Sequence, residues 1–215
     1  FDHSGGIAAL ARDSGAQVVA SPLGAQALRA GKVLDTDPQA GAIDAMPAVE
    51  NVREIADGET LRLGGVTVTA RYTPGHTPGS TSWTWVSCED AAGDDCLNVV
   101  FGASLTPVGA GDFHFSGDAD HADMTPAFRR TMRDFAKLPC DILISAHPDH
   151  SGADEKLRRL LEGATPNPFI DAQACRDYAA RNEAKLDARI AKEKARQKAQ
   201  ETAKETAQDG EAATK

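Results

Sequence analysis

A single histidine held between two Pro-Gly turns, in the segment 73–80 (TPGHTPGS), constrains the fold of this chain more than any other feature. A strand-like run at 66–72 precedes it and another at 80–86 follows, so the turns fix the histidine on a rigid loop between two strands. Such a loop loses little conformational entropy on binding a ligand, and a neutral imidazole is a good zinc donor. The alternative for His76 is an ordinary histidine at a surface turn.

Two other segments carry histidines where α/β folds gather ligands. Residues 2–6 (DHSGG) lie just before a predicted helix, where Asp2 and His3 can face one metal ion, although such a pair taken alone is common and usually structural or incidental. Residues 144–150 (ISAHPDH) follow an apolar strand, which puts His147 at the C-terminal end of that strand. We interpret His150 as a residue beside the site rather than a metal ligand.

One aspartate and three histidines in strand-end loops form a ligand set suited to zinc. Zinc held by histidine and carboxylate, with one position left open, lowers the pKa of bound water toward ~7 and makes a hydroxide nucleophile. The chain has no G-x-S-x-G elbow and no S-x-x-K motif, so no serine nucleophile is indicated. The pattern predicts metal-assisted hydrolysis without a covalent enzyme intermediate.

Alternating helix and strand patterns predict an α/β layered domain. Helices are expected from 4–6 through 11, at 22–30, at 125–138 with Thr125 as its cap, and at 155–161. Strands are expected at 17–20, 60–63, 66–72, 80–86, 97–101 and 141–145, with a Gly-Gly hairpin turn at 64–65. From about residue 179 the composition favours a helix to residue 198, and the last fifteen residues are expected to be solvated or disordered.

Length and charge limit what the chain can be. With 215 residues it can bury one substantial core, which suggests one domain, or one domain with a tail. Its formal net charge of −9 is a poor match for nucleic acid, because an acidic surface repels phosphate. No apolar run approaches the ~20 residues that a membrane-spanning helix needs. The chain begins inside a motif and without methionine, so we expect an upstream part, with any targeting segment, to be missing.

Four cysteines are present and none forms a C-x-x-C pair, which argues against a zinc knuckle or a thioredoxin-like site. Cys88 and Cys96 flank a polar turn and could close a strand-to-strand loop with a disulfide, which leaves Cys140 and Cys175 as a second candidate pair. Such pairing indicates an oxidising compartment. The alternative is four free buried thiols in a cytosolic protein.

Taken together, the three histidine segments resemble the metallo-β-lactamase superfamily. Residues 2–6 resemble the second half of its H-x-H-x-D-H motif, 73–80 its T-P-G-H-T-P-G-S loop, and 146–148 its final histidine. Their order and wide spacing match as well, and the likeness extends over nearly all of residues 1–178. The resemblance implies an αββα sandwich whose N-terminal part is missing here, followed at 179–215 by a charged tail that is helical to disordered.

The stretch 101–106 (FGASLT) discriminates within that superfamily. Members such as glyoxalase II and the lactonases place a bridging aspartate where this chain has Ala103, and the cysteine-ligand lactamases place a zinc-binding cysteine where it has Ser104. A serine there resembles the third subclass of metallo-β-lactamases, whose second zinc is held by Asp, His and His. Cys140 and Cys175 also resemble the pair that ties this subclass's C-terminal helix to its sheet.

The resemblance assigns roles to single residues. It implies two zinc ions in the intact enzyme, with His76 as a ligand of the first, and Asp2, His3 and His147 as ligands of the second. Asp2 would also orient the nucleophile. Ser104 and Thr106 would lie near the substrate carboxylate, with Thr106 in place of the serine often found there. The two histidines expected upstream of Phe1 are absent, so these 215 residues are not expected to be a competent enzyme by themselves.

The hypothesis is a periplasmic or secreted metallo-β-lactamase, a zinc hydrolase that gives antibiotic resistance by opening the β-lactam ring with a metal-bound hydroxide. Its partner would be a small-molecule β-lactam, with no nucleic acid and no membrane, and a monomer is favoured. A related zinc hydrolase of a lactone or thioester is one alternative, against which the missing bridging aspartate argues. A non-catalytic fragment that lacks the first zinc site is the other. His114 and His121 are expected to face solvent, and Trp83 and Trp85 to lie in the core or on a sheet face.

Overall fold

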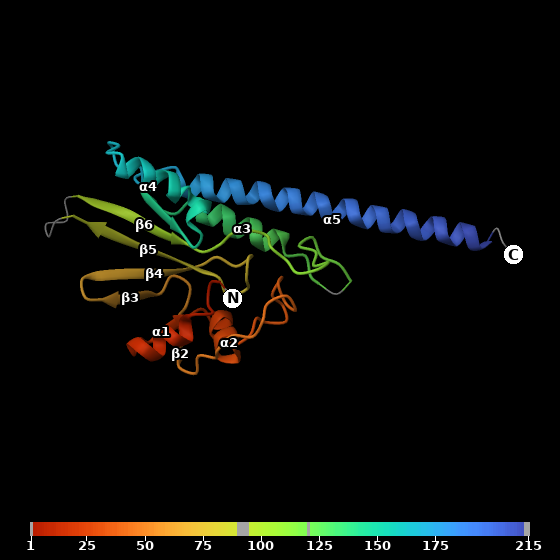
Figure 1. The fold of residues 1–215 in the computed structure, drawn as a ribbon, viewed down its shortest axis with the longest axis horizontal. Coiled ribbons are helices and arrows are strands. Elements are labelled where there is room, and N and C mark those ends of the chain that lie inside the picture. The colour runs from red at the N-terminus through yellow and green to blue at the C-terminus, as the bar shows by residue number, and fades with distance from the viewer. Residues whose placement is uncertain (1, 90–94, 120, 213–215) are drawn as a thin grey trace.

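A five-stranded sheet forms the centre of the computed structural model, which describes residues 2–89, 95–119 and 121–212 (Figure 1). Its strand order is β3-β4-β5-β6-β7. The strands are β3 (Thr60–Leu63), β4 (Val66–Tyr72), β5 (Thr81–Cys88), β6 (Cys96–Gly102) and β7 (Ile142–Ser145). The first four strands pair antiparallel and β7 runs parallel to β6, so β6 and β7 end at the same edge.

Two short-range signals in the sequence fix the strand pairing. Leu63 pairs with Val66, so Gly64 and Gly65 form a two-residue turn, in which Gly64 has a φ of +60°. At the other hairpin the directly opposed Cys88 and Cys96 form a disulfide. Most of the polar turn between these cysteines lies outside the described residues. The predicted hairpin turn and the first predicted disulfide are both confirmed.

Helices cover one face of the sheet. Figure 1 shows α3 (Thr125–Phe135) and α5 (Ala174–Ala212) lying along it, with α4 (Ala153–Leu161) near β7. The core between sheet and helices combines Val100 and Leu143 from the strands with side chains from α3 and α5: Phe128, Met132, Phe135, Tyr178 and Leu186. The α3 residues recur at positions i, i+4 and i+7, which places them on one side of the helix. The predicted Cys140–Cys175 disulfide ties the start of α5 to the segment before β7.

The opposite face of the sheet is apolar and partly open. Trp83, Phe101 and Ile144 pair in one row across β5, β6 and β7, and alternation along each strand turns them away from the helices. Phe101 is 37% exposed and Ile144 is 44% exposed. Trp83 therefore belongs to a sheet face. This face lines part of the cleft described below.

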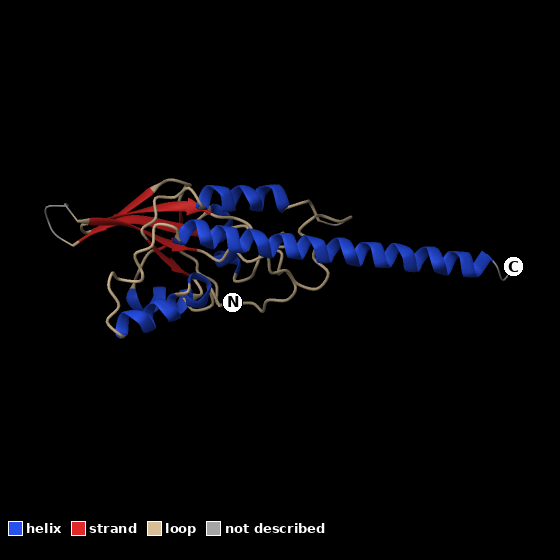
Figure 2. Cartoon of the chain, turned by 90° about the horizontal axis from the view of Figure 1, so that it is seen from above, coloured by secondary structure: helices blue, strands red, loops and turns tan. Residues whose placement is uncertain are grey.

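The N-terminal quarter forms a small unit beside that face. It contains α1 (Ile7–Ser14), β1 (Val18–Ala20), α2 (Pro22–Ala30) and β2 (Val52–Glu54), with β1 and β2 paired in parallel. Ala25 and Leu28 of α2 pack on Val49 and Val52. Figure 2, which views the molecule from above, shows this unit apart from α5, which extends away from the sheet.

The predicted α/β class is confirmed, and several boundaries differ. Thr125 is the first residue of α3 rather than its cap, because the carboxylate of Asp123 accepts a hydrogen bond from the Thr125 amide at 2.8 Å. That helix ends at Phe135, three residues before the predicted end. The C-terminal helix runs on to Ala212, beyond the predicted end at residue 198, through a stretch rich in strong helix formers. Within the described residues, no helix is both long and apolar enough to span a membrane.

Candidate metal centre

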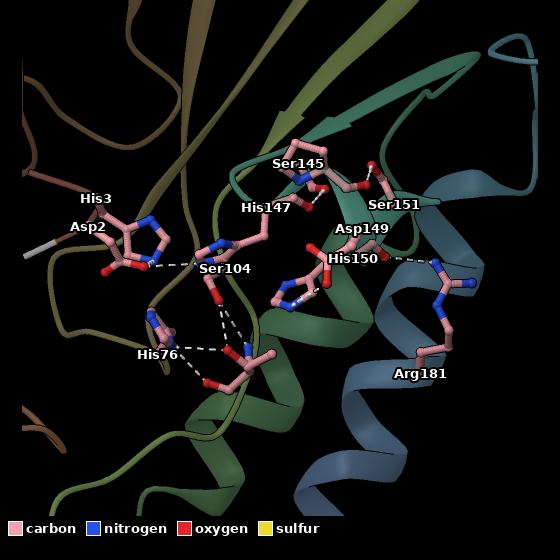
Figure 3. Close-up of polar contacts among 12 residues, drawn as sticks. Asp2, His3, His76, Ser104, Ser145, His147, Asp149, His150, Ser151 and Arg181 are labelled. Atoms are coloured by element: carbon pink, nitrogen blue, oxygen red, sulfur yellow. Dashed lines mark hydrogen bonds and ion pairs between the residues drawn. The ribbon is translucent and has the colours of Figure 1, made fainter. Parts of the chain in front are cut away.

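Three loops that are far apart in the sequence meet beside the ends of β4 and β7 (Figure 3). Asp2 and His3 come from the loop before α1, and His76 from the loop between β4 and β5. His147 lies two residues after the end of β7 at Ser145 and directly before the short 3₁₀ helix η1 (Pro148–Ser151). The backbone amide of Ala146 donates to the carbonyl of Gly102, so the exits of β6 and β7 stay joined at this edge.

Three side chains converge closely enough to share one metal ion. Single ligand atoms of Asp2, His3 and His147 all lie within 4.8 Å of one another. The Oδ2 atom of Asp2 is 3.4 Å from Nε2 of His147 and 3.9 Å from Nε2 of His3. The rings of His3 and His147 are 4.8 Å apart between centroids. A carboxylate and two imidazoles at this spacing are a donor set that zinc accepts.

His76 lies beside this group and is held by its own backbone partner. Its ring centroid is 5.3 Å from that of His3, and the residue is 6% exposed. Nδ1 lies 2.8 Å from the carbonyl oxygen of Thr106. A carbonyl can only accept a hydrogen bond, so Nδ1 carries the proton and Nε2 keeps its lone pair. This is the arrangement by which a backbone oxygen orients a metal-binding histidine.

The loop that carries His76 is fixed by close packing. Gly75 has a φ of +147°, and a side-chain carbon added there would lie 2.1 Å from the ring of Phe128. The hydroxyl of Thr131 on α3 donates to the carbonyl of Pro74 at 2.8 Å. Thr73 is buried, and its hydroxyl lies 3.0 Å from that of Ser82. Only glycine fits at position 75, which explains why the loop needs this sequence.

The electrostatics of the site favour metal-binding protonation states. Burial lowers the pKa of both His3 and His76 below the ordinary histidine value, so both are neutral donors at pH 7. Burial raises the pKa of Asp2, but the positive charge that His3 carries in the acidic range where a carboxylate titrates, together with a backbone hydrogen bond, outweighs that effect and holds the pKa below its ordinary value. The carboxylate is therefore ionised and can only accept hydrogen bonds.

The two hydroxyls expected near a substrate lie next to each other. Oγ of Ser104 is 2.8 Å from Oγ1 of Thr106, and Ser104 is 3% exposed. Ser104 lines the cleft together with His3 and His76. The Thr106 hydroxyl also lies 3.3 Å from Nδ1 of His76, so Thr106 supports the histidine through both its carbonyl and its side chain.

A cleft of about 350 Å³ is lined by Asp2, His3 and His76. One wall comes from the exposed sheet face and another from residues 33–46, a segment for which the sequence indicated no role. Within that segment Asp37 is buried, and burial raises the pKa of its carboxyl group. Its Oδ1 accepts from the amide of Gln39 at 2.8 Å. The Asp-Pro-Gln turn was a local signal that could have marked this wall.

The remaining histidines lie outside the convergent group. The His150 ring is 4.8 Å from that of His147, but among the described residues the group of possible metal ligands contains Asp2, His3 and His147 without it. His121 is partly exposed, and its Nδ1 lies 2.8 Å from a carboxylate oxygen of Asp118.

Carboxylate and histidine side chains that converge at one edge of an α/β sheet are typical of metal-binding α/β domains.

No protein-family model matches the chain. The chain is 42% identical to MEM-A1, a subclass B3 metallo-β-lactamase from a soil metagenome library, over 89% of this chain and 71% of that one, with a TM-score of 0.83. SMB-1, solved in a complex with mercaptoacetic acid, is 39% identical over 88% and 70% of the two chains, with a TM-score of 0.80. BJP-1, a subclass B3 metallo-β-lactamase of Bradyrhizobium japonicum, is 30% identical over 89% and 69%, with a TM-score of 0.75.

The chain therefore belongs to the metallo-β-lactamase family, and within it to subclass B3. The family resemblance and the fold predicted from the sequence are confirmed. The assignment of individual zinc ligands and substrate contacts stays a prediction, which is developed next.

Proposed function

We propose that this chain forms the catalytic region of a zinc-dependent β-lactamase. Asp2, His3 and His147 would hold one zinc ion, and His76 would contribute to a second. The observation that carries the proposal is the convergence of the first three side chains in a chain that is 42% identical to a subclass B3 enzyme. Bound zinc supplies Lewis-acid activation of water and of a carbonyl group.

The residues of the chain supply orientation. The ionised carboxylate of Asp2 accepts a hydrogen bond from the attacking water and so directs its oxygen toward the lactam carbonyl. His76 cannot rotate without losing its bond to the Thr106 carbonyl, which keeps Nε2 directed at the site. The chain offers no serine nucleophile motif, so hydrolysis proceeds without a covalent enzyme intermediate.

Substrate binding is assigned to the hydroxyls and the cleft. Ser104 donates a hydrogen bond to the substrate carboxylate, and Thr106 orients the Ser104 hydroxyl from 2.8 Å away. The apolar walls of the cleft contact the body of the antibiotic. The two disulfides support a periplasmic or secreted location, because such bonds persist in oxidising compartments.

The test is carbapenem hydrolysis, followed by ultraviolet absorbance, in the natural protein with whatever residues its gene encodes upstream of Phe1. A matched sample treated with a zinc chelator runs beside it. Turnover that the chelator abolishes and added zinc restores supports the proposal. A folded protein that carries two zinc ions without turnover refutes it, and a lactone or thioester then becomes the substrate to test.

A further inference from the structure

The C-terminal helix α5 reaches two loops near the cleft, one after β6 and one after β7, with side chains that bond to their backbones. Tyr178 donates its hydroxyl to the carbonyl of Ala103 at 2.9 Å, one residue before Ser104. Arg181 donates to the carbonyl of His150 at 3.2 Å. Further along, Arg189 and Glu193 bond to residues 113–116. The helix therefore connects to every loop that follows β6 and β7 at this edge.

Glu193 is the most unusual of these side chains, because it is a carboxylate that is only 2% exposed. Its Oε1 accepts from the Phe115 amide at 3.0 Å and from Nε of Arg189 at 2.8 Å. Its Oε2 accepts from the amide of Ser116 at 3.1 Å and from the Ser116 hydroxyl at 2.8 Å. Burial raises the pKa of Glu193, but these hydrogen bonds outweigh it and hold the pKa below its ordinary value. The buried charge is fully satisfied, and it binds a loop 77 residues away in sequence.

That loop touches the wall of the cleft. The Phe113 amide donates to the carbonyl of Ala110 at 3.0 Å, and the Ala110 amide donates to the carbonyl of Pro38 at 2.8 Å. Gly109 packs against both segments, since an added side-chain carbon would lie 3.2 Å from Phe113 and 3.3 Å from the Pro38 carbonyl oxygen. Pro38 is fully buried, and its neighbours on both sides line the cleft.

A continuous path of polar contacts thus runs from α5 to the cleft. Arg189 adds to it by donating to the Phe113 carbonyl and by lying 5.8 Å over the Phe115 ring. The same loop also contains Thr106, whose carbonyl is bonded to His76. The side chain at 193 lies at the far end of this path, outside the metal centre and outside the cleft lining.

We propose that Glu193 is a positioning residue for the substrate cleft: from the C-terminal helix it fixes residues 113–116, and through them the cleft wall at 37–39. The inference rests on the proposed function, because the substrate concerned is the β-lactam. Loss of the carboxylate leaves the amides of 115 and 116 and Nε of Arg189 without their acceptor, so the loop must shift until water can replace it. The wall bonded to it then loses its fixed position, while the zinc ligands do not.

Hydrogen–deuterium exchange on the folded protein tests this directly, with the variants Glu193→Ala and Glu193→Gln. We expect the amides of 115 and 116 to exchange roughly ten- to a hundredfold faster in Glu193→Ala, because hydrogen bonds to a charged group are lost. The amides of 39 and 40 should follow, and those of α3 and β5 should not change. Glu193→Gln keeps one acceptor oxygen and should give a smaller effect at the same positions. Glu183→Gln is the matched control, because Glu183 lies on α5 and pairs with Arg129 of α3 instead of a loop.

Kinetics give a second readout that a merely structural role would not produce. In the zinc-loaded natural protein, KM for a carbapenem should rise several-fold in Glu193→Ala, while kcat changes by less than about twofold and the zinc content stays the same. The inference would be overturned if exchange at 39 and 40 were the same in Glu193→Ala as in wild type. It would also be overturned if exchange rose equally throughout the domain, or if KM did not change. If the wild-type protein has no turnover, the proposed function fails, and the exchange measurement alone decides whether Glu193 positions this wall.

Discussion

Replacing Tyr178 with phenylalanine is the sharpest test of how α5 supports the site. Tyr178 is fully buried, and its hydroxyl donates to the carbonyl of Ala103 at 2.9 Å. Phenylalanine keeps the ring in the core and removes only the oxygen. The carbonyl then lacks this donor, at a cost of about 1–2 kcal/mol. For a chain of this length, that cost corresponds to a fall in Tm of about 3–6 °C.

The pH dependence of this variant carries a separate signature. Burial raises the pKa of Tyr178 to about 12, and a backbone contact with Leu105 offsets this only in part. An unfolded tyrosine titrates near 10, so the folded state holds its proton more tightly. The stabilisation is fully present below about pH 10 and is lost as the pH rises through 12. The difference in Tm between wild type and Tyr178→Phe should therefore narrow in this alkaline range.

The assay is thermal unfolding followed by circular dichroism from pH 7 to pH 11.5, and the chain provides its own control. Tyr72 is the other tyrosine, and its hydroxyl donates to the carbonyl of Ile55 at a partly exposed position, where water can replace it. Tyr72→Phe should lower the Tm by less than Tyr178→Phe does. Equal shifts in the two variants, or a gap that does not change with pH, would refute the reasoning.

Other changes test the metal centre and its supports. His147→Ala should weaken zinc binding more than about tenfold in a competition titration with a chromophoric chelator, whereas His121→Ala should leave it unchanged. Gly75→Ala should cost about 2–4 kcal/mol in denaturant unfolding, because the new methyl group meets the phenyl ring beneath the loop; full stability would contradict the packing. Replacing Cys140 and Cys175 with alanine should cost about 3–4 kcal/mol, since their disulfide closes a loop of 35 residues; no loss would mean that other contacts already restrain α5.

The sequence predicted best where local chemistry decides the structure. The Pro-Gly turns around His76 and the Gly-Gly turn at 64–65 set backbone angles by themselves, so their loops could be recognised without tertiary information. The apolar run before His147 predicted a strand, and a strand exists there. Pairing of Cys88 with Cys96 followed from their positions on either side of one turn.

Prediction was poorest where the local structure depends on contacts with residues far away in the sequence. The strand β2 has three residues and no alternating pattern, and it exists because β1 offers it a partner. Glu193 gave no motif, since its partners at 115 and 116 approach it only in the folded chain. Thr125 was wrongly predicted as a helix cap, because its amide and its hydroxyl both donate to the carboxylate of Asp123, which holds Thr125 as the first residue of the helix.

The bonds between α5 and the cleft loops have a consequence for folding during synthesis on the ribosome. Tyr178 and Glu193 bond to backbone groups that lie 75 and 78 residues earlier in the chain and are synthesised well before α5. The apolar sheet face that packs on α5, with Val100 and Leu143, is therefore synthesised well before the helix that covers it. Contacts between such distant segments form slowly, and until they form the growing chain exposes apolar surface that can aggregate. Nascent chains halted before α5 should need chaperone protection that chains including α5 do not.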